Sequence, residues 1–167
     1  MNNLNNLLQV LLENEIDFVL IGGFAGVVHG STQVTRDLDI CALVTPAQVE
    51  KLRLALKDLH PRHRMNPNFK PSFLTEPNDL TNLQNIYLET DLGVLDIISQ
   101  VTEVGNFEQV KKNSVEIDIF GRKCRVISVD ALIKAKEKMG RDKDKLVVAE
   151  LKALRWLRSE KLPGSVP

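Results

Sequence analysis

Two aspartates, Asp37 and Asp39, alternate with apolar residues in the stretch DLDI. Successive side chains of a β-strand point to opposite faces, so both carboxylates would share one face while the leucine and isoleucine enter the core. Asp96 lies in a similar apolar stretch, on a strand that could lie beside the first. Three clustered carboxylates repel each other unless a cation neutralises them, and oxygen ligands suit Mg²⁺ or Mn²⁺. The pattern predicts a divalent-metal site; the alternative is a half-exposed strand that alternates for packing alone.

A second copy of the pattern, EIDI at residues 116–119, is interpreted differently. If Gly121 and Arg122 form a two-residue hairpin turn, Asp118 faces Arg125 on the paired strand. The acid would then be matched by a base. We therefore interpret this copy as structural.

The glycine pair Gly22-Gly23 closes a predicted strand at 17–21 and precedes a short predicted helix at 24–29. Free backbone N–H groups at such a turn, with no side chains in the way, allow a phosphate to approach closely. The spacing is neither that of a Walker A loop nor that of the Rossmann fingerprint. A tight-packing turn is the alternative interpretation.

The remaining pattern predicts alternating helices and strands around these residues. We expect helices near 4–12, 46–59, 129–139 and 143–160, a strand at 38–44, and hairpins at 85–99 and 114–127. Between them, residues 60–82 hold four prolines and no clear period, which is typical of a lid or a binding loop. His60 and His63 fall in this loop and are expected to be solvated rather than metal ligands. The 167 residues are expected to form a single domain, residues 1–167, with a core at about 17–127 and a helical part at about 128–160.

Taken together, the glycine pair, the DLDI stretch after thirteen intervening residues and the LDI stretch around Asp96 resemble the nucleotidyltransferase superfamily that includes DNA polymerase beta. Within it, GSTQVTRDLDI and VISVDALIKAKEKMGRDKD are similar to segments of the minimal bacterial nucleotidyltransferases related to the AbiEii toxins. The matching segments run from about Asp17 to Asp144. The resemblance implies an α/β (α+β) nucleotidyltransferase fold, with a mixed β-sheet flanked by helices and further helices at the C-terminus.

The resemblance also implies an activity, the transfer of a nucleoside monophosphate from an NTP such as ATP to an acceptor hydroxyl. Asp37 and Asp39 would hold two divalent ions, Mg²⁺ or Mn²⁺, and Asp96 would share one and help to deprotonate the acceptor. The implied nucleotide-binding residues are the glycine pair at the β- and γ-phosphates, together with Thr35, Lys136, Arg141 and Lys143.

The acceptor is predicted less narrowly. The expected acceptor is an RNA 3′ end, such as that of tRNA, or a hydroxyl group of a protein. Either acceptor is consistent with a toxin, for which a cognate antitoxin is a candidate partner. Residues 122–167 carry 13 Lys/Arg against 6 Asp/Glu, whereas residues 1–121 carry 9 against 16, and a basic surface favours a nucleic acid. Trp156, a candidate for stacking on bases, is expected in the core. The alternatives are a non-catalytic nucleotide-binding or antitoxin-like module, and a small-molecule (antibiotic) nucleotidyltransferase with a pocket under the 60–82 loop.

Composition limits the class of protein. No apolar run approaches the ~20 residues that span a bilayer, and the N-terminus lacks the pattern of a secretory signal, so we expect a cytoplasmic protein that does not interact with membranes. Cys41 and Cys124 lie in strand-like apolar stretches without metal-site spacing. They are predicted to be buried, reduced thiols.

Overall fold

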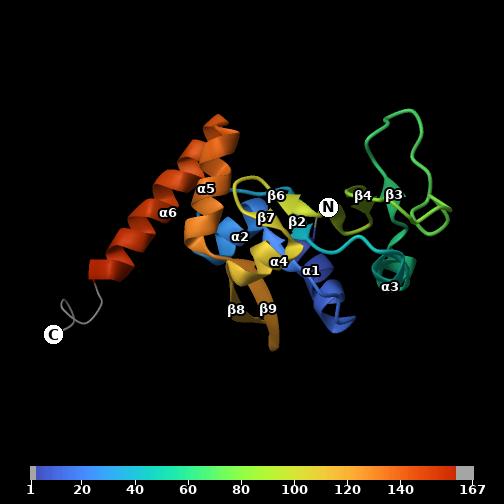
Figure 1. Ribbon diagram of the computed structural model, residues 1–167, viewed down its shortest axis with the longest axis horizontal. Coiled ribbons are helices and arrows are strands. Elements are labelled where there is room, and N and C mark those ends of the chain that lie inside the picture. Colours follow the sequence, from blue (N-terminus) through green and yellow to red (C-terminus); the bar gives the residue numbers. More distant parts are fainter. Residues whose placement is uncertain (1–2, 161–167) are drawn as a thin grey trace.

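A seven-stranded mixed sheet forms the centre of the protein (Figure 1), whose computed structural model describes residues 3–160. Its strand order is β3-β4-β5-β2-β1-β9-β8. β2 runs antiparallel to β1 and parallel to β5. The strands are β1 (Val19–Ile21), β2 (Asp37–Cys41), β3 (Arg62–His63), β4 (Ile86–Thr90), β5 (Gly93–Ile98), β8 (Ser114–Ile119) and β9 (Arg122–Ile127).

Helices surround this sheet, and most begin at a residue that caps the first turn. The side chains of Thr45 and Ser128 accept hydrogen bonds from the backbone N–H groups of the first turns of their helices, which stabilises those ends. The helices are α1 (Leu4–Glu13), α2 (Gly22–Val28), α3 (Pro46–Leu56), α4 (Phe107–Lys112), α5 (Val129–Met139) and α6 (Asp142–Glu160), with a short 3₁₀ turn, η1, at Lys57–Leu59.

The core follows the predicted periodicities. The leucines of α1, spaced three and four residues apart, are buried, and α1 contacts α3 and the strands β2, β5 and β9. In β2, Leu38 and Ile40 are fully buried, whereas Asp37 and Asp39 on the other face are only half-buried. The strand therefore presents its two carboxylates away from the core, on the face that the alternation predicted.

α5 and α6 form a helical hairpin that turns at Gly140, whose φ of +67° is the left-handed conformation that favours glycine. α6 packs one face against α5 and α2, where Val147 and Leu151 are buried. Its opposite face is exposed and includes Trp156, with 61% of its surface accessible. The prediction of a core position for Trp156 is wrong, because the helix buries only the face that meets the body of the protein.

The β8–β9 hairpin corrects one predicted contact. Its turn is formed by Phe120 and Gly121, both with positive φ, one residue earlier than expected. Asp118 therefore lies opposite Lys123 and pairs with it at 3.1 Å, instead of with Arg125. The acid is matched by a base, as inferred, but by a different one.

Three short elements were not predicted from the sequence: α4, the edge strand β3, and the small two-stranded sheet of β6 (Gln100–Val101) and β7 (Gly105–Asn106). β3 falls inside the segment predicted as a loop. The rest of that segment is tied to α3, because Arg53 donates hydrogen bonds to the carbonyl oxygens of Phe73 and Pro77.

Both cysteines lie in the core. Cys41 and Cys124 are buried free thiols, as expected. Among residues 3–160, no helix is both long and apolar enough to cross a membrane.

Candidate functional site

Three carboxylates meet on neighbouring strands at the centre of the sheet. β2 and β5 are parallel, and their register places Asp39 directly opposite Asp96 and Asp37 opposite Val94. One oxygen from each of Asp37, Asp39 and Asp96 lies within 4.8 Å of the others. The alternation on two adjacent strands therefore brings residues nearly 60 positions apart in the sequence to one point.

Burial and the neighbouring negative charges make the ionised forms of Asp39 and Asp96 less favourable. Burial, reinforced by the negative charges of Asp96 and Asp37, raises the pKa of Asp39 from 3.8 to about 6. Burial also raises the pKa of Asp96, although its hydrogen bonds with Arg64 oppose that rise. A set of hard oxygen donors that disfavours its own ionisation is suited to a divalent cation such as Mg²⁺ or Mn²⁺.

The glycine pair lies directly against the carboxylates. Gly22 has a φ of +68°, and a Cβ at this position would overlap Oδ2 of Asp39. A Cβ at Gly23 would lie 2.9 Å from Oγ1 of Thr35, which itself donates a hydrogen bond to the carbonyl oxygen of Asp37 at 3.1 Å. Both glycines are thus required by close packing, and they expose the backbone of the β1–α2 turn beside the acids.

A hydrogen-bond network holds the strand entry in place. The carboxylate of Glu150, on α6, accepts hydrogen bonds from the backbone N–H and the hydroxyl of Thr32 and from the hydroxyl of Ser31. Arg158 donates to the carbonyl oxygen of His29. α6 thereby fixes the segment that leads from α2 to Thr35 and β2.

Basic residues of the α5–α6 hairpin form one wall of the site. Lys136 is 6% exposed, and its Nζ lies 3.4 Å from Oδ1 of Asp144. Arg141 donates two side-chain hydrogen bonds to the same carboxylate, at 2.6 and 3.1 Å. Burial opposes the charge of Asp144, but hydrogen bonds from Arg141 and the charge of Lys136 lower its pKa. Asp144, which was not among the predicted site residues, orients both cations.

Arg64 forms the opposite wall, and sequence reasoning missed it. Its Nε and Nη2 donate to Oδ1 and Oδ2 of Asp96 at 3.1 and 2.6 Å, and its guanidinium carbon lies 5.7 Å from the centre of the Tyr87 ring. Arg64 directly follows β3, within the proline-rich segment. No periodicity in that segment indicated that one of its arginines reaches the centre of the sheet.

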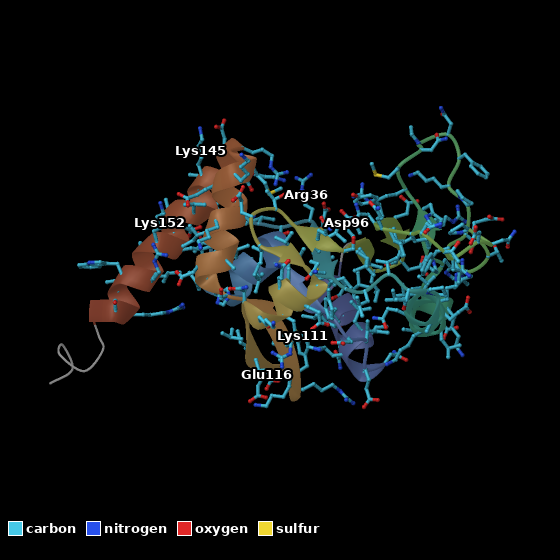
Figure 2. All side chains as sticks on the ribbon, viewed as in Figure 1. Arg36, Asp96, Lys111, Glu116, Lys145 and Lys152 are labelled. Carbon is cyan, nitrogen blue, oxygen red and sulfur yellow. The ribbon has the colours of Figure 1, made fainter. Side chains whose placement is uncertain are left out.

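The three aspartates, the glycine turn, the basic wall and Arg64 line one cleft of about 770 Å³. Every residue of the predicted site borders it: the three aspartates, Gly22, Gly23, Thr35, Lys136, Arg141 and Lys143. In Figure 2, the labelled Arg36 and Asp96 lie between the α5–α6 hairpin and the loop that follows β3. The cleft therefore has an acidic floor and cations on both sides, an arrangement that can hold a metal ion together with a polyphosphate.

The loop histidines His60 and His63 lie outside the site, as expected. The Nδ1 atom of His60 lies 2.6 Å from a carboxylate oxygen of Asp91. Nε2 of His63 lies 2.7 Å from the carbonyl oxygen of Glu76. Within residues 3–160, the aspartate cluster is the one group of three or more acidic, histidine or cysteine side chains arranged to hold a metal.

Comparisons with known proteins bear on the fold. No protein-family model matches the sequence, and no curated protein matches it. Among solved structures, the chain is similar to the lincosamide antibiotic adenylyltransferase LnuA with bound lincomycin, at 21% identity over 90% of this chain and 95% of that one, with a TM-score of 0.62. It is similar to ANT(2″)-Ia in complex with adenylyl-2″-tobramycin, at 15% identity over 96% and 97%, with a TM-score of 0.52.

A third similar structure is an antigenic nucleotidyltransferase-like protein from Paracoccidioides brasiliensis, at 15% identity over 92% of this chain and 73% of that one, with a TM-score of 0.58. These likenesses show that the chain has a nucleotidyltransferase fold. They confirm the predicted mixed sheet flanked by helices. A specific relationship to the AbiEii toxins stays a prediction.

Proposed function

We propose that this protein transfers a nucleoside monophosphate from an NTP to a hydroxyl group and releases pyrophosphate. The observation that carries the proposal is the meeting of Asp37, Asp39 and Asp96 beside the glycine turn, in a cleft whose wall is basic. The nucleotidyltransferase fold supports it. One fold serves many reactions, so the residues of the site define the activity.

The three aspartates would hold the divalent cation. Their oxygens are close enough to share one ion, and burial together with the charges of Asp96 and Asp37 raises the pKa of Asp39 to about 6, so a bound cation would offset a cost that the cluster carries. When bound, Mg²⁺ or Mn²⁺ supplies neutralisation of phosphoryl charge and a lower pKa of the attacking hydroxyl.

The chain's own residues position the nucleotide. Lys136, Arg141 and Lys143 lie along one side of the cleft and would bind the triphosphate, while the backbone at Gly22 and Gly23 lets a phosphate approach the acids closely. Asp144 keeps two of these cations oriented. Reaction then forms a bond between the acceptor oxygen and the α-phosphorus and breaks the bond to the β-phosphate.

Asp96 is the candidate proton acceptor. Its carboxylate is buried, with a pKa raised above the ordinary value, so it holds a proton more readily than a solvated aspartate. Its neighbours Arg64 and Tyr87 lie on the side of the cleft opposite to the α5–α6 hairpin. The acceptor hydroxyl would therefore approach from this side and transfer its proton to a carboxylate oxygen of Asp96.

Two classes of acceptor have specific support. The basic C-terminal third favours an RNA such as tRNA. A small molecule is favoured by the volume of the cleft, about 770 Å³, which falls in the usual range for small-ligand pockets, and by similarity over nearly the whole chain to LnuA and ANT(2″)-Ia. A protein acceptor, a toxin role and a cognate antitoxin rest on the sequence resemblance alone.

The test is transfer of label from each α-labelled NTP with Mg²⁺ or Mn²⁺ to total tRNA, to the protein itself, and to a panel of hydroxylated antibiotics. Asp39→Asn should abolish transfer, and Asp118→Asn, the acid of the second EIDI copy, should leave it unchanged. Binding of Mg·NTP without labelling of any acceptor would favour a non-catalytic nucleotide-binding module. Transfer at the wild-type rate by Asp39→Asn would refute the site.

A further inference from the structure

Asp96 already has a cationic partner in this structure. Two donors of one guanidinium, Nε and Nη2 of Arg64, reach its two carboxylate oxygens at 3.1 and 2.6 Å. Both groups are shielded, with 27% of the Arg64 side chain and 12% of the Asp96 side chain accessible. This two-point geometry is the strong form of an arginine–carboxylate contact.

The same carboxylate belongs to the proposed metal site, whose three oxygens lie within 4.8 Å of one another. A cation that binds all three aspartates would sit close to the guanidinium of Arg64. Two positive groups that contact one carboxylate in a shielded cleft repel each other strongly, because solvent screens them little. The arrangement seen here is therefore suited to one of the two cations at a time.

We propose that Arg64 occupies the cation position on Asp96 in the metal-free protein and is displaced when the divalent ion binds, so that metal loading breaks the side-chain contact between Asp96 and the segment that follows β3. The inference rests on the proposed function, because it assumes the metal site. It assigns Arg64 a positioning role: the residue keeps Asp96 charged and in place until the ion arrives, and it makes the ion compete for the site.

The Arg64 side chain is one of several contacts that hold this segment against the sheet. β3 is a two-residue edge strand, and beyond it the backbone N–H of Arg64 donates to the carbonyl oxygen of Tyr87 at 3.2 Å. The next residues, Met65 to Lys70, are exposed. The loop lies across the molecule from α5 and α6 (Figure 1). In the proposed reaction, the acceptor enters on this side. The backbone of His63 also donates to the carbonyl oxygen of Pro71, so displacement of the Arg64 side chain removes one of several tethers and leaves the exposed residues between the others freer to move.

The test compares Mn²⁺ binding to the wild-type protein, Arg64→Gln and Arg62→Gln by titration calorimetry, with Asp39→Asn as the check on the site. Arg62 is the matched control, since it is an exposed arginine two residues away. We expect Arg64→Gln to bind Mn²⁺ at least about fivefold more tightly than wild type, the lower end of typical couplings between two ligands. Arg62→Gln should match the wild type. Arg64→Lys, which keeps the charge but loses the two-point contact, should fall between wild type and Arg64→Gln.

Hydrogen exchange of residues 62–70 supplies a second readout that does not depend on activity. In the wild type, Mn²⁺ should speed exchange in this segment. In Arg64→Gln, exchange should be fast already and unchanged by the ion. A merely structural role for Arg64 would speed exchange in the variant without changing its affinity for Mn²⁺.

The outcomes separate this inference from the proposed function. Equal Mn²⁺ affinity in wild type and Arg64→Gln, with binding lost in Asp39→Asn, overturns the role of Arg64 and leaves the metal site intact. Absence of Mn²⁺ binding in the wild type, or binding that Asp39→Asn does not weaken, overturns the metal site and the inference with it.

Discussion

Asp39→Asn should make the metal-free protein more stable at neutral pH, even though it removes a residue central to the proposed reaction. Asp39 is half-buried beside two other carboxylates, and its pKa is raised from 3.8 to about 6. Each pKa unit corresponds to about 1.4 kcal/mol, so the ionised carboxylate lowers the free energy of unfolding by up to about 3 kcal/mol at neutral pH. Asparagine carries no charge and avoids this penalty.

The sign of the effect follows from proton linkage. Because the folded protein binds the Asp39 proton more tightly than the unfolded chain does, this proton stabilises the fold fully below pH 3.8, and that stabilisation is lost as the pH rises through about 6. The advantage of Asp39→Asn over wild type should therefore be small near pH 4 and reach about 2–3 kcal/mol above pH 7.

Urea unfolding followed by circular dichroism, in EDTA at pH 4 and pH 7.5, measures this difference. Asp118→Asn is the matched control, because Asp118 lies in an exposed pair with Lys123 that should contribute less than about 1 kcal/mol. Added Mg²⁺ should stabilise wild type and not Asp39→Asn. If Asp39→Asn proves no more stable than wild type at pH 7.5, the reasoning about the crowded carboxylates is wrong.

Three further predictions concern the same cleft. Gly22→Ala should abolish nucleotidyl transfer in the labelling assay, because its Cβ displaces Asp39. The control is Gly121→Ala, which is also at positive φ but in open space. It should lose only about 1–2 kcal/mol of stability and keep full activity. Asp144→Asn should destabilise the protein by about 3 kcal/mol in urea unfolding, because it leaves the buried Lys136 without its charged partner. The control Glu137→Gln, in an exposed pair with Lys152, should cost less than about 1 kcal/mol. Mn²⁺ affinity, measured calorimetrically, should fall by up to about tenfold per pH unit below pH 6 as Asp39 becomes protonated, and a flat profile would contradict its place among the ligands.

Much of the acidic floor could be predicted because strand alternation is a local rule. Once DLDI and the stretch around Asp96 are assigned to strands, each carboxylate must lie on one face of the sheet. The apolar residues on either side of it occupy the core face, so the carboxylate lies on the other. The strands themselves could be predicted because apolar residues alternate with polar ones, or run continuously, in those stretches of the sequence. What the alternation does not specify is the parallel register that sets Asp39 opposite Asp96, since that depends on the whole sheet.

The parts that were missed depend on contacts between distant segments. Arg64 reaches Asp96 from a segment without periodicity, and the buried Asp144 pairs with Lys136 of another helix and with Arg141. α4 has only six residues, too few to show a helical period. Trp156 lies outside the stripe of Val147, Val148 and Leu151 that α6 buries, so its exposure follows from the helical period, whereas the prediction of a core position relied on residue type.

The most direct test of the account is a crystal structure with Mn²⁺ and a non-hydrolysable NTP, read from the anomalous signal of manganese. We expect a peak about 2.0–2.3 Å from oxygens of Asp37, Asp39 and Asp96, with the triphosphate running from that peak toward Lys136 and Arg141. A manganese peak elsewhere, or a nucleotide bound away from the three carboxylates, would contradict the account.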